Sequence, residues 1–193
     1  MKSYPVIKDR KIKAAIVGCG RISKNHFDSL EKHKKHVELV SICDDDKSVL
    51  AIHEKKYNIK GYLDLASMIE NVDLDLVILC TPSGLHAEQT ETCAKKGINI
   101  MTEKPMATRW NDGIRMVKVC DQAGVRLFVV KQNRNNPTIK LIKRAIKENR
   151  FGKIYMVQLN VFWSRPQSYY DQAPWRGTWE FDGGALMNQA SHY

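Results

Sequence analysis

The first two thirds of the chain alternate between short apolar runs and longer amphipathic stretches. The runs are rich in Val, Ile and Leu without strict alternation, which is typical of strands buried on both faces of a parallel sheet. Repetition of strand, helix and strand with short links predicts a right-handed, doubly wound α/β fold. The predicted strands are residues 13–18, 37–44, 74–81, 98–104 and 125–131.

Helices are predicted between these strands. The amphipathic stretches 85–97 and 109–124 end on Gly97 and Gly124. Glycine suits the left-handed conformation that often follows the last turn of a helix. Each of these helices should therefore lead directly into the next strand.

The pattern changes after residue 130. Asn136 and Pro137 suit the N-cap and the first turn of a helix at 135–152. Residues 153–164 then alternate between apolar and polar, which predicts a strand of a half-exposed, mainly antiparallel sheet.

This change of pattern predicts a domain boundary at 130–136. We expect residues 1–130 to form the doubly wound domain and residues 131–193 to form the incomplete start of an α+β domain. A chain of 193 residues is long enough for one large domain and part of another.

Composition narrows the class of protein and of partner. With 43% hydrophobic and 27% charged residues, the chain is typical of a folded globular protein. The formal net charge of +10 indicates an anionic partner. The basic residues are dispersed, without a basic tail or a nucleic-acid-binding motif, so we expect phosphorylated metabolites and no nucleic acid.

The cysteines and the start of the chain bear on the compartment. The five cysteines form no CxxC pair and no histidine-spaced cluster, which predicts reduced thiols and no metal site. No apolar run is long enough to span a membrane, and the polar start lacks the apolar stretch of a signal peptide. We therefore expect a soluble, cytoplasmic protein.

A glycine loop follows the first predicted strand. Gly18 and Gly20 allow a tight turn and a close approach of the backbone to a pyrophosphate at the next helix N-terminus, although the third motif position is Ser23. Asp44 ends the second strand 24 residues after Gly20, where its carboxylate can accept hydrogen bonds from a ribose and repels a 2′-phosphate. This pattern predicts a Rossmann-type site for NAD. The alternative is that Asp44 only opens the polar turn 44–47.

Lys104 ends the predicted strand 98–104 and precedes Pro105. Ligands of open parallel sheets bind beyond the carboxyl ends of the strands, so Lys104 should face the same crevice as the glycine loop. A buried lysine can lose its proton near neutral pH and take part in acid–base chemistry. The alternative is an ordinary surface charge.

Asn188 and His192 lie four residues apart, after two glycines that open a predicted helix. This spacing places both side chains on one helix face. Taken alone, the spacing of the pair is a coincidence, because a histidine near a terminus is usually a surface residue.

These stretches together resemble the Gfo/Idh/MocA family of nicotinamide-dependent sugar oxidoreductases. Within it, the chain is most similar to the dehydrogenases of UDP-N-acetyl-2-amino-2-deoxyglucuronate (UDP-GlcNAc uronate). The resemblance covers essentially the whole chain and rests on the segments GCGRIS, TPSGLH, EKPMATRW, VKQNRNNP and YDQAPWRGTWEFDGGALMNQASHY.

The resemblance implies cofactor contacts by position. Glu103 and Lys104 would lie at the nicotinamide, with Lys104 touching both cofactor and substrate. The implied contacts with NAD are Gly18, Gly20, Arg21, Ile22, Asp44, Thr81, Ser83, His86, Glu103, Lys104, Gln132, Trp175 and Arg176.

The resemblance also makes His192 the acid–base residue, with the Asn188 amide beside it. Hydride would leave carbon 3 of the sugar for the nicotinamide while His192 or Lys104 removes the hydroxyl proton. Histidine titrates near neutral pH, whereas lysine needs a depressed pKa, which favours His192 as the base. The opposite assignment stays open.

Arg165, Tyr169 and Tyr170 are candidate substrate contacts, together with Lys104 and the Asn188–His192 pair. An arginine fork matches the oxygens of a carboxylate or a phosphate. The alternative for the two tyrosines is packing at the end of a strand.

The implied reaction is NAD-dependent oxidation of the 3-hydroxyl of the UDP-sugar uronate to a 3-keto sugar, in bacterial lipopolysaccharide biosynthesis. One alternative is an NAD-binding remnant without catalysis. Another is a dehydrogenase of the same family for a different sugar or for inositol.

Members of this family are longer and continue with further strands of the second domain. We therefore expect a truncated product or a fragment, the alternative being a deliberately short protein. The homo-oligomer of the relatives is built largely through that second sheet, so the same assembly is in doubt for this chain.

Overall fold

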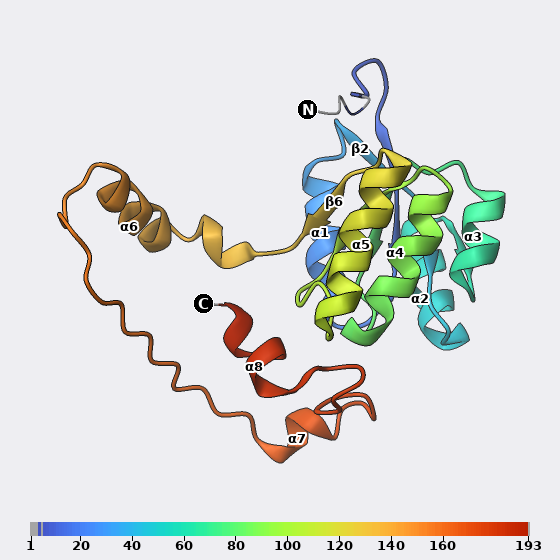
Figure 1. Cartoon of the computed structure of the whole chain (residues 1–193). Helices are drawn as coiled ribbons and strands as arrows, with labels where there is room; N and C mark the ends of the chain where they lie inside the picture. The colour runs from blue at the N-terminus through green and yellow to red at the C-terminus, as the bar shows by residue number, and fades with distance from the viewer. Residues whose placement is uncertain (1–3, 5, 193) are drawn as a thin grey trace.

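A computed structural model describes residues 4 and 6–192; the predicted outer domain limits, residues 1 and 193, lie outside them. Its centre is a parallel sheet covered by helices on both faces (Figure 1), as the sequence predicts. The strand order is β3-β2-β1-β4-β5-β6. The strands are β1 (Ile12–Val17), β2 (Val37–Cys43), β3 (Lys60–Tyr62), β4 (Leu76–Leu79), β5 (Asn99–Thr102) and β6 (Leu127–Val129).

Five helices pack on this sheet. Their apolar faces and the strands form one cluster on each side, α1 and α2 on one face and α3, α4 and α5 on the other. The burial of both faces explains why the strands show no strict alternation. The helices are α1 (Ser23–Lys32), α2 (Lys47–Tyr57), α3 (Leu65–Asn71), α4 (His86–Lys95) and α5 (Trp110–Ala123).

The glycine signals at the helix ends are confirmed. Gly97 follows α4 with a φ of +74°, and Gly124 caps α5 with a φ of +69°. The edge strand β3 was not predicted, because three residues are too few to show a pattern. It pairs in parallel with β2 at one edge of the sheet.

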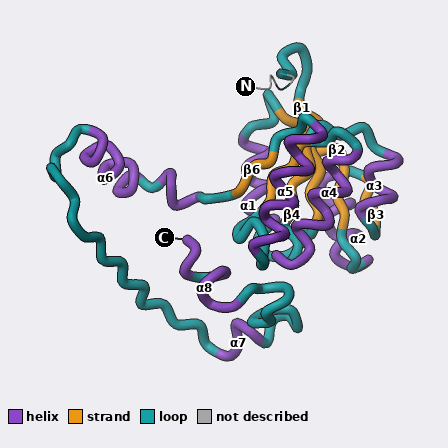
Figure 2. The backbone as a smooth tube through the Cα atoms, viewed as in Figure 1, coloured by secondary structure: helices purple, strands orange, loops and turns teal. Residues whose placement is uncertain are grey.

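After β6 the chain leaves the sheet and forms α6 (Pro137–Lys147), whose first turn begins after Asn136 as predicted. In Figures 1 and 2, α6 lies away from the sheet, and a long extended segment leads from it to the C-terminal part. The strand predicted at 153–164 is wrong: no strand is found there, and the six-stranded parallel sheet is the only sheet among the described residues. Tyr155 is 84% exposed and Phe162 is 94% exposed. A strand is stabilised by hydrogen bonds and side-chain pairs with a neighbouring strand, and no strand lies beside this segment in the described part of the chain.

The chain then returns to the carboxyl ends of the strands through α7 (Gln167–Tyr170), α8 (Gly184–Asn188) and a 3₁₀ turn at Ala190–His192. The Gly84 amide after β4 donates to the Phe181 carbonyl at 3.1 Å. A Cβ at Gly84 would overlap the Glu180 carbonyl, so only glycine permits this approach. The return segment therefore covers the edge of the sheet where the glycine loop and Lys104 lie.

Candidate active site

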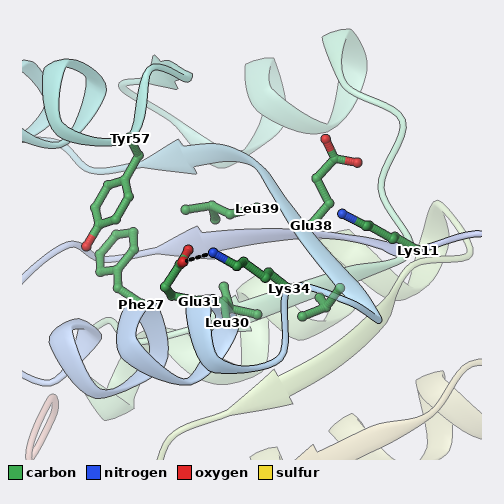
Figure 3. A pocket seen from close by; sticks show the side chains of 9 residues that line it. Lys11, Phe27, Leu30, Glu31, Lys34, Glu38, Leu39 and Tyr57 are labelled. Carbon is green, nitrogen blue, oxygen red and sulfur yellow. Dashed lines mark hydrogen bonds and ion pairs between the residues drawn. The ribbon is translucent and has the colours of Figure 1, made fainter.

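A cavity of about 1480 Å³ that is open to solvent lies at the carboxyl ends of the strands. Single small-molecule pockets span roughly 300–1,000 Å³, so this cavity has room for a cofactor and a substrate together. A smaller cavity of about 190 Å³ lies near the amino ends of β1 and β2, where Phe27 faces Tyr57 and Lys34 pairs with Glu31 (Figure 3). All but two of the predicted site residues line the larger cavity, the exceptions being His86 and Tyr170.

The glycine loop forms one end of the cavity. Gly18 has a φ of +85°, and a Cβ there would lie 2.8 Å from the Cys80 carbonyl carbon and the Thr81 nitrogen. A Cβ at Gly20 would meet no atom within 4 Å, so the backbone is open to a ligand at this point. No side chain caps α1, whose N-terminus is therefore available to an anion. These features fit a pyrophosphate.

Ser23 stands at the third motif position, where glycine is usual. Its side chain is buried, and its hydroxyl donates to the Gly20 carbonyl at 2.6 Å. The serine is thus satisfied within the loop itself, which explains why the loop keeps its shape without a third glycine.

Asp44 lies in the cavity at the end of β2, as predicted. Its Oδ2 accepts a hydrogen bond from the Cys19 amide at 2.6 Å, and its Oδ1 accepts one from the Asp46 amide at 2.9 Å. An ionised carboxylate has about four acceptor positions, so two remain for a ribose. The same side chain therefore braces the glycine loop and can receive a ligand.

His86 was expected beside the cofactor, but the structure buries it completely, away from the cavity surface. Its Nε2 lies 3.0 Å from the Thr81 carbonyl and its Nδ1 3.0 Å from the Pro105 carbonyl. Burial lowers the pKa of this imidazole. In this structure His86 joins the loops after β4 and β5 and does not line the cavity.

Glu103 is held from two sides at the end of β5. His26 Nε2, on α1, lies 2.8 Å from Glu103 Oε1, and Glu103 Oε2 accepts the Lys104 amide at 3.2 Å. His26 was missed in the sequence because a single histidine on a helix gives no signal of its distant partner. It links the helix of the glycine loop to the acid expected at the nicotinamide.

Lys104 faces the crevice, as predicted, and is not an ordinary surface charge. Its Nζ donates to the main-chain oxygen of Asn188 at 2.5 Å and to Asn188 Oδ1 at 2.9 Å. Burial lowers the pKa of this ammonium, while the negative charges of Glu103 and Asp182 oppose that effect. The charges of Lys131 and Arg165 lower it further.

Asn188 and His192 both line the cavity, although they do not share one continuous helix. α8 ends at Asn188, and His192 lies in the separate 3₁₀ turn. His192 Nδ1 is 3.3 Å from Gln132 Nε2, on the chain just after β6. Burial lowers the pKa of His192, and the nearby Lys104 and Lys131 charges act in the same direction. The neutral imidazole is therefore favoured near neutral pH.

Three arginines surround the ring of Tyr169. The guanidinium carbons of Arg176, Arg165 and Arg21 lie 4.5, 5.1 and 5.8 Å from its centroid. None of the ion pairs found in the described part of the chain involves them. The Nε atoms of Arg165 and Arg176 are buried without a hydrogen-bond partner among the described residues. Such a cationic cluster suits an anionic ligand. Tyr170 packs edge-on against Tyr169 at 5.2 Å, which agrees with the packing alternative for this residue.

Two family models match this chain, one for each of its parts. Residues 12–131 match an oxidoreductase family with an NAD-binding Rossmann fold, GFO_IDH_MocA, and residues 139–193 match the GFO/IDH/MocA C-terminal domain. The chain belongs to the Gfo/Idh/MocA oxidoreductase family.

Solved structures of this family include two that are similar over nearly the whole chain. One is the WlbA dehydrogenase from Chromobacterium violaceum in complex with NADH and UDP-GlcNAcA, at 58% identity and a TM-score of 0.97, covering 100% of this chain and 56% of that one. The other is WlbA from Bordetella pertussis, also with NADH and UDP-GlcNAcA, at 56% identity and a TM-score of 0.95, covering 97% and 56%.

Curated relatives within the Gfo/Idh/MocA family are more distant. D-apiose dehydrogenase of Paraburkholderia graminis is 31% identical over 81% of this chain and 40% of its own length. Myo-inositol 2-dehydrogenase of Thermotoga maritima is 27% identical over 77% of this chain and 44% of its own length. The chain spans about half the length of the relatives it matches.

Two negative findings concern the described residues of this family member. None of its helices has the length and apolar character to cross a membrane. The described part also holds no group of three or more His, Cys, Asp or Glu side chains placed to bind a metal ion.

Proposed function

We propose that this chain binds NAD and belongs to a dehydrogenase that oxidises the 3-hydroxyl of UDP-GlcNAc uronate to a 3-keto sugar. The observation that carries the proposal is that a single cavity contains both the glycine loop with Asp44 and, farther along, Lys104 and His192. The similarity to two WlbA structures that hold NADH and UDP-GlcNAcA supports the choice of cofactor and substrate.

The cofactor end of the cavity fits a dinucleotide. Gly20 opens the backbone towards the ligand, the uncapped N-terminus of α1 favours a pyrophosphate, and Asp44 keeps acceptor positions for a ribose. When bound, NAD supplies the hydride acceptor. Placed at the end of β5, Glu103 and Lys104 then stand where the nicotinamide end is expected.

Lys104 and His192 take different parts in the proposed chemistry. Lys104 uses two of its three N–H groups on Asn188, which leaves one to hydrogen-bond the substrate hydroxyl oxygen and hold it in place. His192, whose pKa is lowered by burial, is neutral near neutral pH and can accept the hydroxyl proton. This division supports His192 as the base and Lys104 as the group that orients the oxygen.

Arg165, one of the arginines around Tyr169, supports the choice of an acidic substrate. A UDP-sugar uronate carries a diphosphate and a carboxylate, and both match arginine donors. Arg165 and Arg176 have buried Nε donors without partners in the described part of the chain, which an anion would satisfy. A neutral sugar or an inositol would leave the Arg165 donor unpaired, whereas Arg176 is a predicted contact of the cofactor.

The wider setting is also part of the proposal. UDP-activated sugars are donors in polysaccharide assembly, so we place the reaction in bacterial lipopolysaccharide biosynthesis. The five free, buried cysteines support a reducing compartment such as the cytoplasm. A domain boundary at 130–136 is supported by the end of the sheet at Val129.

Calorimetric titration with NADH, together with a turnover assay on UDP-GlcNAc uronate, tests the proposal. Asp44→Ala should weaken NADH binding by about tenfold, because a ribose contact and a brace of the glycine loop are lost. His192→Ala should leave NADH binding intact and lower kcat by about 10²–10⁴-fold, the usual contribution of a general base. His33→Ala, at an exposed position, is the matched control.

Each other outcome has a clear meaning. NADH binding without turnover of any sugar would support a binding remnant and contradict the dehydrogenase. Turnover of free sugars or inositol in preference to the UDP-uronate would contradict the proposed substrate. Failure of NADH to bind would overturn the proposal as a whole.

A further inference from the structure

A buried carboxylate lies behind Lys104, on the far side of Asn188. Asp182 is 3% exposed and Asn188 is 8% exposed. The Asn188 Nδ2 donates to Asp182 Oδ1, while Asn188 Oδ1 accepts from the Lys104 ammonium at 2.9 Å. Asp182, Asn188 and Lys104 thus form a polar chain that leads from the interior to the reacting end of the cavity. The chemistry proposed above uses only its last two members.

The orientation of the Asn188 amide follows from its two neighbours. An ammonium group can only donate and an ionised carboxylate can only accept. The amide oxygen must therefore face Lys104, and the amide nitrogen must face Asp182. In the flipped orientation, the amide nitrogen would face the Lys104 ammonium and the amide oxygen would face the Asp182 carboxylate. Neither pair could then form a hydrogen bond.

Asp182 also needs both of its own oxygens. Its Oδ2 accepts the Gly177 amide at 2.7 Å, in the turn that precedes α8. An asparagine in this place has one accepting oxygen and one donating nitrogen, so it can satisfy only one of the two donors that face it. Among side chains of this shape, only a carboxylate fits between Gly177 and Asn188.

We propose that Asp182 is a positioning residue, which fixes the amide orientation of Asn188 and through it holds the Lys104 ammonium at the substrate hydroxyl. The inference rests on the proposed function for its consequence in turnover, but its geometry stands independently. This role of Asp182 also explains why residue 188 carries an amide and not a carboxylate. An aspartate there would bring a second buried carboxylate against Asp182.

The charge of Asp182 contributes as well as its hydrogen bond. The charged groups that act on Lys104 are Glu103 and Asp182, which favour the ammonium, and Lys131 and Arg165, which oppose it. Removing the negative charge of Asp182 should therefore lower the pKa of Lys104. His192, which also lines the cavity and feels the charge of Lys104, should respond only through that residue.

The test compares Asp182→Asn with a double variant that exchanges the two residues, Asp182→Asn with Asn188→Asp. In Asp182→Asn, either the Gly177 amide or the Asn188 side-chain amide loses its acceptor. In the double variant the new amide at position 182 can accept from Gly177 and donate to the new carboxylate at position 188, which can in turn accept from Lys104. Every hydrogen bond of the chain is thereby restored, with the carboxylate and the amide exchanged.

We expect Asp182→Asn to lower kcat/KM for the UDP-uronate by about tenfold and to shift the limb of the pH profile that belongs to Lys104 to lower pH. The double variant should recover most of the activity and return that limb to higher pH. Asn188→Asp alone should be worse than the double variant, because it places two buried carboxylates against each other. Glu180→Gln, which removes an exposed charge from the same turn, should behave like wild type.

A second readout keeps the inference separate from the proposed function. Lysine ¹³Cε signals, assigned through Lys104→Arg, report the titration of Lys104 by NMR without any substrate. The titration should move to lower pH in Asp182→Asn and recover in the double variant. An unchanged Lys104 titration in folded Asp182→Asn, or a double variant no better than the single ones, overturns the inference. Absence of turnover in wild type, with the Lys104 shift present, would instead contradict the proposed function alone.

Discussion

Two parts of this chain have sequences typical of strands, and only one of them lies in a sheet. β1 lies between β2 and β4 and has no exposed residue. The segment 153–163 is equally rich in apolar residues but is extended, exposed and without a neighbouring strand in the described part of the chain. The pattern of apolar residues shows which surface a segment can bury. Whether it is buried depends on partners that the pattern does not contain.

Removal of a large apolar side chain should separate the two parts most clearly. Ile16, in β1, is fully buried, so Ile16→Ala should lower the free energy of unfolding by about 2–5 kcal/mol. Val157, in the extended segment, is 82% exposed, and Val157→Ala should change it by less than about 0.5 kcal/mol. Urea unfolding measures both. Similar losses in the two variants would show that the segment is packed in solution.

The junction between the sheet and the return segment gives the next largest effect. Gly84→Ala places a Cβ against the Glu180 carbonyl, at a cost of about 1–3 kcal/mol if the backbone must move. Amide exchange should accelerate in residues 177–192 and stay unchanged in the central strands. Gly20→Ala, where a Cβ meets open space, is the matched control. Unchanged exchange in Gly84→Ala would mean that the contact is absent in solution.

His86 should make the stability of the sheet region depend on pH. Its folded-state pKa lies below the ordinary 6.5 because burial disfavours the charged ring, so the unfolded chain binds the proton more readily. Stability present above pH 6.5 is therefore lost as the pH falls, by up to about 1.4 kcal/mol per pH unit. Urea midpoints at about pH 8 and about pH 5.5 should converge in His86→Gln but not in His33→Gln. Equal pH dependence in wild type and His86→Gln would refute this account.

The smallest effect concerns a helix start within the sheet region. Asp46 caps α2, where its Oδ1 accepts the Ser48 amide at 2.8 Å. Asp46→Ala should therefore destabilise the protein by about 1 kcal/mol, measured by thermal unfolding. The neighbouring exposed Asp45→Ala should have almost no effect. Equal losses would indicate general charge effects and no specific cap.

The parts predicted from the sequence are those governed by local chemistry. Short stretches predict five of the six strands of the sheet, the glycine caps of α4 and α5, the loop at Gly18 and the strand-end place of Lys104. His26 could not be found in this way, because its partner Glu103 is 77 positions away. Asp182 could not be found either, because its hydrogen bonds reach Lys104 only through Asn188. Lys104 and Asn188, for example, are 84 positions apart.

The burial of His86 could not be predicted for a related reason. Its place in a cofactor-lining segment says nothing of the depth at which the ring lies. Two main-chain carbonyls, one after β4 and one after β5, decide that depth. The antiparallel strand at 153–164 failed because pairing requires a second strand.

The route of the chain through the exposed segment 153–163 has a consequence for how the cavity is assembled. Residues 165–192 reach the carboxyl edge of the sheet at the end of this segment, which acts as a tether, and the exposed Lys153 at its start is open to trypsin. While this tether is uncut, residues 165–192 are held at a high effective concentration near the sheet. A single cut would make the association of these two parts bimolecular. The parts would then dissociate on dilution, and the cavity would be lost.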